Sequence, residues 1–104
     1  MAHRIRVSDE ALNQIEAIRD YIAKDSPRNA ARWLENLHSR LNRLSYSDES
    51  HAVLYTPEQA SLEVRQTFYG TYRILYSIDG DIVHVLSVRH GARRPMGPDE
   101  LREL

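Results

Sequence analysis

Four side chains that can carry positive charge fall within six residues near the end of the chain: Arg89, His90, Arg93 and Arg94. Arginine binds phosphate and carboxylate groups through paired hydrogen bonds, and histidine exchanges a proton near neutral pH. Such a cluster could clamp an anion or assist the cleavage of a phosphodiester. The whole chain has a formal net charge of only −1, so we expect local anion recognition rather than general binding to polyanions.

Arg65 and Arg73 are the further candidates for this cluster. Arg73 and His90 are predicted to share one face of a hairpin, and Arg65 to lie on the neighbouring strand. His90 could then move a proton while the arginines hold a phosphate. A purely structural role stays open as well, because arginines at strand ends commonly remain solvated or pair with acids. The acids available in the tail include Asp99, Glu100 and Glu103.

The sequence predicts no metal site and no cofactor. Its five histidines form no helical i, i+4 pair, and the chain has no cysteine to complete a zinc site. Its four glycines form no phosphate-binding loop, since each has an explanation as a turn residue. The histidines are His3, His38, His51, His84 and His90.

The first half of the chain predicts one short strand and a helical hairpin. Residues 3–7 alternate polar and apolar side chains, the period of a half-buried strand. Ser8 is a good helix N-cap, and Ser26 followed by Pro27 starts a second helix that runs to Leu44. So short a connection makes the two helices antiparallel neighbours. The first helix has an apolar stripe of Leu12, Ile15, Ile18 and Ile22, widened by Ala11 and Tyr21. The second helix has a stripe of Ala30, Leu34, Leu37, Leu41 and Leu44.

The second half predicts a three-stranded antiparallel meander. A polar stretch at 45–61 comes first, with a possible single turn at Thr56-Pro57-Glu58. Residues 62–69 then form the first strand, and Asp79-Gly80 joins the other two strands through a type I′ turn. The predicted fold class is therefore α+β, a β-α-α-β-β-β order with both helices on one face of the sheet. One domain is expected over residues 1–104.

The hairpin register assigns the two faces of the sheet. With Asp79-Gly80 as the loop, Ile78 faces Asp81, Tyr76 faces Val83, and the tyrosines of this strand point toward the helices. The opposite face is also apolar, and the short tail is a poor cover for it. We therefore expect a groove for another polypeptide, with self-association or a tail that folds back as the alternatives. The groove residues are Leu75, Ile82, Leu86 and Val88.

Composition favours the cytoplasm. The chain has no cysteine, so no disulfide can form, and its first residues lack the apolar run of a signal peptide. No stretch reaches the roughly 20 apolar residues that a membrane span needs. We expect no association with a membrane.

The element order and two motifs resemble the RelE/ParE superfamily of toxins from bacterial type II toxin–antitoxin systems. The motifs are G-x-Y-R-I-x-Y at Gly70–Tyr76 and V-x-V-L-x-V-R-H-G-x-R at Val83–Arg93, and the helical segment AARWLENL is also typical. The resemblance implies a toxin that a cognate antitoxin holds inactive. It also implies that the antitoxin covers the apolar groove and binds operator DNA, so the toxin reaches that DNA only indirectly.

Within this superfamily the resemblance implies one of two activities. ParE-like members trap DNA gyrase on cleaved DNA, whereas RelE-like members cut messenger RNA on the ribosome with a set of basic residues. The paired lysines of the RelE-like set fall at about Val64 and Gln66 here, which favours the gyrase inhibitor, associated with growth arrest and plasmid stabilisation. No catalytic residue is then needed. The predicted target-binding residues are Arg73, Arg89, His90, Arg93 and Arg94.

Two alternatives to gyrase inhibition stay open. A ribosome-dependent endoribonuclease would use Arg65, Arg73 and His90, with arginine a poor proton shuttle because its pKa exceeds about 12. A degenerate member would bind its antitoxin and do nothing else.

Overall fold

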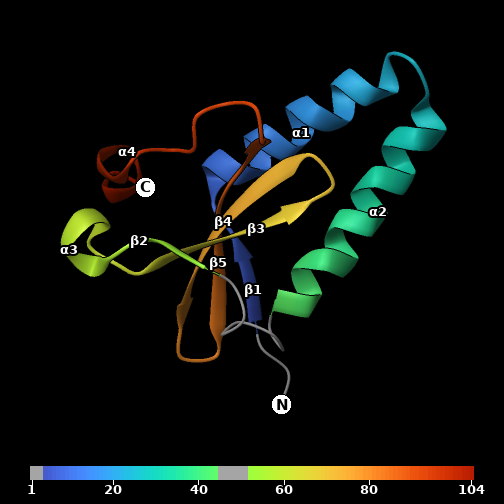
Figure 1. Cartoon of the computed structure of the whole chain (residues 1–104). Coiled ribbons are helices and arrows are strands. Elements are labelled where there is room, and N and C mark those ends of the chain that lie inside the picture. Colours follow the sequence, from blue (N-terminus) through green and yellow to red (C-terminus); the bar gives the residue numbers. More distant parts are fainter. Residues whose placement is uncertain (1–3, 45–51) are drawn as a thin grey trace.

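A computed structural model describes residues 4–44 and 52–104. It has five strands and four helices in these ranges (Figure 1). In chain order they are β1 (Arg4–Val7), α1 (Asp9–Ala23), α2 (Pro27–Leu44), β2 (Val53–Tyr55), α3 (Pro57–Ala60), β3 (Val64–Tyr69), β4 (Tyr72–Asp79), β5 (Ile82–His90) and α4 (Pro98–Arg102).

The strands form one sheet in the order β1-β5-β4-β3-β2. β1 pairs in parallel with β5, and the remaining pairs are antiparallel. The predicted α+β order and the antiparallel meander are confirmed. The short edge strand β2 is an addition, and the predicted turn at Thr56-Pro57 is the start of α3. The rest of the polar stretch, residues 45–51, lies outside the described residues, as does His3.

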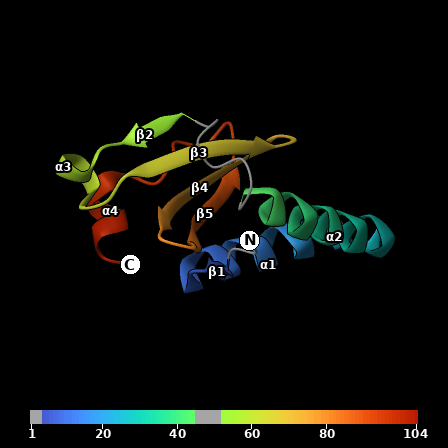
Figure 2. The same cartoon turned by 90° about the horizontal axis from the view of Figure 1, so that it is seen from below.

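The helical hairpin forms where capping residues predict it. The Ser8 hydroxyl accepts a hydrogen bond from the Ala11 N–H at 3.1 Å, and the Ser26 hydroxyl accepts one from the Asn29 N–H at 3.1 Å. Both helices cover one face of the sheet, as the view from below displays (Figure 2). None of the helices in the described ranges is long and apolar enough to span a membrane.

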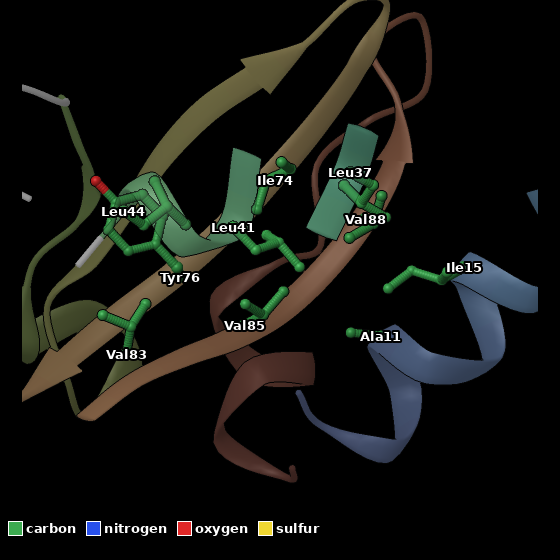
Figure 3. Close-up of a cluster of buried hydrophobic side chains, with 10 residues drawn as sticks. All are labelled: Ala11, Ile15, Leu37, Leu41, Leu44, Ile74, Tyr76, Val83, Val85 and Val88. Atoms are coloured by element: carbon green, nitrogen blue, oxygen red, sulfur yellow. The ribbon is translucent and has the colours of Figure 1, made fainter. Parts of the chain in front are cut away.

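The larger core lies between this hairpin and the sheet. Its apolar side chains converge from α1, α2, β4 and β5 (Figure 3). Leu12, which the helical stripe places in the core, is instead 48% exposed, because the stripe that faces the sheet centres on Ala11 and Ile15. The buried members are Ala11, Ile15, Leu37, Leu41, Leu44, Ile74, Tyr76, Val83, Val85 and Val88.

A second core covers the opposite face of the sheet, which corrects the prediction of an uncovered apolar face. The tail does not act alone there, because α3 and α4 pack together over the sheet (Figure 1). The Tyr55 hydroxyl donates to the Met96 carbonyl at 2.9 Å, and the Arg102 guanidinium donates to the carbonyls of Glu58 and Gln59. The buried members are Ala60, Val64, Leu75, Leu86, Met96 and Leu101.

The β4–β5 turn differs from the predicted one by one residue. Asp79 pairs with Ile82, so Gly80 and Asp81 form the turn, and Ile78 faces Val83 rather than Asp81. Gly80 has a φ of 62° whereas Asp81 is not in the positive-φ region, and a type I′ turn would require both. Glycine at the first central position is the pattern of a type II′ turn.

A β-bulge in β5 changes which residues share a face. Leu75 pairs with Ser87 while Tyr76 pairs with Val85, so Leu86 has no partner on β4. Beyond this point the alternation of β5 is reversed. Val88 therefore enters the core beneath the helices, and it does not share a face with Leu86 as predicted.

Two side chains of the α1 region bind the backbone of the bulge. β1 ends opposite Val85, so the following part of β5 lacks a strand on that side. The Ser8 hydroxyl donates to the Leu86 carbonyl at 3.1 Å, and the Val88 N–H donates to Gln14 Oε1 at 2.7 Å. These bonds satisfy backbone groups that the sheet leaves without a strand partner.

Candidate functional site

Arg73 and Arg89 lie directly opposite each other on β4 and β5. Arg73 Nη1 donates to the Arg93 carbonyl at 3.2 Å, and Arg89 Nη1 donates to the Arg94 carbonyl at 3.4 Å. We call this pair of sheet arginines the tail clamp. The clamp holds the backbone of two consecutive residues whose own side chains are exposed, Arg93 and Arg94.

Further contacts fix the tail clamp. The Arg73 guanidinium lies 5.4 Å from the centre of the Phe68 ring, and Arg89 Nη2 lies 3.6 Å from Glu100 Oε2. The hydrogen bond from the Gly97 N–H, at 2.9 Å, is the main reason that the pKa of Glu100 lies below its ordinary value of 4.5. Desolvation opposes this effect, and the nearby charges of Arg89 and Arg94 add to it.

His90 lies on the other side of the sheet. The bulge turns it toward the helices, where its ring contacts Tyr72 edge-on with the centroids 5.6 Å apart. Its Nδ1 accepts a hydrogen bond from the Ala92 N–H at 3.0 Å. The prediction that His90 shares a face with Arg73 is therefore wrong.

Arg65 does not join either group. It pairs with Tyr76 on β4, and its guanidinium lies 3.0 Å from Glu63 Oε1. Tyr76 is four residues along β4 from Tyr72, the partner of His90, a separation of about 13 Å. The residues of the nuclease hypothesis, Arg65, Arg73 and His90, are thus not brought together.

A groove lies between α1 and the end of β5, with a volume of about 490 Å³. We call it the α1 groove. Ala17, Ile18 and Tyr21 of α1 supply apolar surface to this groove at helical spacings of three and four residues. The same periodicity in the sequence predicts only burial in the core. The lining residues are Gln14, Ala17, Ile18, Tyr21, Tyr72, Val88, Arg89, His90 and Arg93.

A second groove, of about 410 Å³, lies beside α4 on the opposite face of the sheet. We call it the tail groove. Of the four residues predicted to bind a polypeptide, Leu86 lines this groove and Ile82 is half-buried on the same face. Leu75 and Val88 are each 1% exposed, Leu75 in the core on the tail side and Val88 in the core beneath the helices, where it also borders the α1 groove. The tail-groove residues are Leu62, Glu63, Ser77, Ile78, Asp79, His84, Leu86, Leu101 and Leu104.

No group of three or more potential metal ligands occurs among residues 4–44 and 52–104. Within that part of the chain His38 is on the exposed side of α2, and His84 lines the tail groove. His3 and His51 lie outside it.

The sequence places the chain among the toxins of type II toxin–antitoxin systems. Residues 5–95 match the sequence profile of the ParE toxin of the type II toxin–antitoxin system parDE. The chain therefore belongs to the ParE toxin family, within the RelE/ParE superfamily. No curated protein sequence matches the chain.

Three solved structures share the fold. The chromosomal ParDE system of P. aeruginosa superposes with a TM-score of 0.66 at 15% identity, over 86% of this chain and 96% of that one. The RelBE2 toxin–antitoxin complex of Mycobacterium tuberculosis superposes with a TM-score of 0.55 at 24% identity, over 86% of this chain and 99% of that one. The archaeal RelE–RelB complex of Pyrococcus horikoshii OT3 superposes with a TM-score of 0.55 at 14% identity, over 90% of this chain and 100% of that one. At these identities the likeness supports the fold alone.

Proposed function

We propose that this toxin inhibits DNA gyrase and is neutralised by a cognate antitoxin. The observation that carries the proposal is the match of residues 5–95 to the ParE toxin profile, because gyrase inhibition is the activity that the ParE-like resemblance implies. Growth arrest and plasmid stabilisation would follow from that activity. The toxin would act in the cytoplasm, where its target works.

The arrangement of the basic residues supports a binding role over catalysis. Cleavage of RNA needs one group to activate the 2′-hydroxyl and another to protonate the leaving oxygen. His90, the candidate proton carrier, faces the helices, while Arg73 faces the tail on the other side of the sheet. Arginine alone is a poor proton shuttle.

We assign target contact to the exposed guanidinium groups of Arg93 and Arg94, with His90 beside them in the chain. The sheet arginines Arg73 and Arg89 position these two residues through their carbonyls rather than contacting the target. Holding the backbone in advance reduces the entropy lost when a flexible charged segment binds.

The antitoxin would bind the apolar surface that stays accessible. Ile82 and Leu86 remain candidates from the predicted set, with the tail-groove residues around them. The three structural neighbours are toxin–antitoxin systems or complexes, which supports a partner of this kind. Operator DNA would be bound by the antitoxin and not by this chain.

Purified toxin, released from its antitoxin and refolded, tests the proposal in a gyrase supercoiling reaction. We expect supercoiling to stop and cleaved DNA to accumulate as toxin is added. In parallel, messenger RNA from induced cells should stay intact at the ribosome. Ribosome-dependent cleavage that is abolished by Arg73→Ala would support the RelE-like nuclease instead, and folded protein without any effect on growth would indicate an inactive member.

A further inference from the structure

The α1 groove combines an apolar floor with a positive rim. Ala17 and Tyr21 expose their side chains on α1, and Tyr21 is 70% exposed, unusual for so large a ring. Tyr72 and Val88 contribute apolar surface from the sheet. A concave apolar surface with a few converging polar groups is the usual form of a binding site.

The charged residues that line the α1 groove are all basic. They are Arg89, His90 and Arg93, and none of the described residues lining it is a carboxylate. The tail groove has the opposite character, because Glu63 and Asp79 line it. An acidic segment is therefore attracted to the α1 groove and repelled from the tail groove.

We propose that the α1 groove binds an acidic segment of the cognate antitoxin, with an apolar side chain against Tyr21 and a neighbouring carboxylate at Arg93. This inference rests on the proposed function, since it needs an antitoxin and a target. The same guanidinium, that of Arg93, is assigned to target contact above. An antitoxin segment in the α1 groove would thus neutralise the toxin by occupying part of its target-binding surface.

Alkylation of a single introduced thiol tests whether the antitoxin segment lies in the α1 groove. The natural chain has no cysteine, so Ala17→Cys places one thiol in the groove and Ala31→Cys places a matched one on exposed α2. Reaction with iodoacetamide is followed on the toxin by mass spectrometry, with and without antitoxin. We expect the antitoxin to slow the Ala17→Cys reaction at least about tenfold and to leave the Ala31→Cys reaction nearly unchanged.

A pair of charge variants tests the chemistry of the segment. Ala17→Glu should weaken antitoxin binding about tenfold through like-charge repulsion, whereas Ala17→Lys should bind as tightly as the natural chain or more tightly. Equal weakening by both variants would contradict an acidic segment. Ala31→Glu, the matched control on α2, should leave the affinity unchanged.

The two proposals can fail separately. If the natural chain binds its antitoxin but the Ala17→Cys thiol reacts equally fast free and bound, or if both thiols are slowed equally, the groove proposal is wrong. If instead the free natural chain leaves gyrase active, the proposed target is wrong whatever the thiols do.

Discussion

At the scale of single residues, Arg73 and Arg89 position the tail rather than forming an exposed basic patch. Each donates to a backbone carbonyl of the tail, and the Nε of each is buried without a hydrogen-bond partner. A guanidinium offers five donors in a fixed plane, so it can hold a carbonyl, an acid and an aromatic face together. The exposed charges at Arg93 and Arg94 depend on this support.

The hydrogen bond from the Gly97 N–H, together with the nearby arginine charges, gives Glu100 a specific pH dependence. Because the folded protein lowers the pKa of Glu100 below 4.5, the ionised form favours folding, and this stabilisation is present above 4.5 and lost as pH falls through the folded pKa. Thermal unfolding should find Glu100→Gln less stable than the natural chain at neutral pH. The difference should disappear in acid.

Glu103→Gln is the matched control for Glu100→Gln, because Glu103 is also exposed and lies in the same tail. At neutral pH, Glu103→Gln should unfold at nearly the same temperature as the natural chain. A constant gap between Glu100→Gln and the natural chain down to strong acid would contradict an electrostatic origin.

At the scale of the elements, the bulge in β5 decides which residues face which core. It turns Val88 and His90 toward the helices, and it keeps Leu86 and Arg89 on the tail side. Its unpaired backbone groups depend on α1 for hydrogen bonds. We therefore expect the contact between α1 and β5 to be sensitive to the loss of one amide side chain.

Gln14→Ala should lower the free energy of unfolding by about 1 to 3 kcal/mol, because it removes the acceptor of the Val88 N–H, and Val88 is 1% exposed. Urea denaturation measures the change. Asn13→Ala alters the exposed neighbour on the same helix and should change the value by less than about 0.5 kcal/mol. Equal effects of the two variants would mean that the Gln14 bond is not stabilising.

The elements and their order could be predicted from the sequence, because apolar periodicity and capping residues are local signals. The face of each residue after the bulge could not be predicted by strict alternation. Ile82, Leu86 and Val88 are all apolar at even positions, so strict alternation assigns them to one face, whereas the bulge moves Val88 to the other face.

The second core was harder to predict. It joins α3 and α4, two short segments about forty residues apart in the sequence, and each buries a single side chain, Ala60 and Leu101. Neither segment has enough apolar periodicity to indicate burial by itself. The burial of Leu75 and Leu86, two of the predicted groove residues, follows from this long-range contact, which hydrogen bonds from Arg102 and Tyr55 support.

At the scale of the whole molecule, two cores on opposite faces of one sheet stabilise a chain of 104 residues. The smaller core depends on α4. Leu101, 3% exposed, fills it, whereas Leu104 in the same tail is 51% exposed. Comparing these two leucines therefore distinguishes the effect of burial from the effect of lying near the end of the tail.

Leu101→Ala should cost about 2 to 5 kcal/mol of the free energy of unfolding, a large part of the total for a domain of this size. Leu104→Ala should cost less than about 0.5 kcal/mol. Urea denaturation of both variants measures the difference. A cost for Leu101→Ala as small as that for Leu104→Ala would mean that α4 separates from the sheet before the rest of the chain unfolds.

The central claim is that a cationic pair, held at one end of the sheet, acts on gyrase. Titration of gyrase supercoiling with the natural chain and with the double variant Arg93→Ala/Arg94→Ala tests it most directly. We expect the natural chain to inhibit with accumulation of cleaved DNA, and the double variant to require at least about tenfold more protein. Arg28→Ala/Arg32→Ala, which removes two exposed arginines of α2, should inhibit like the natural chain. No inhibition by the natural chain, or equal potency of the Arg93→Ala/Arg94→Ala variant, would contradict the account.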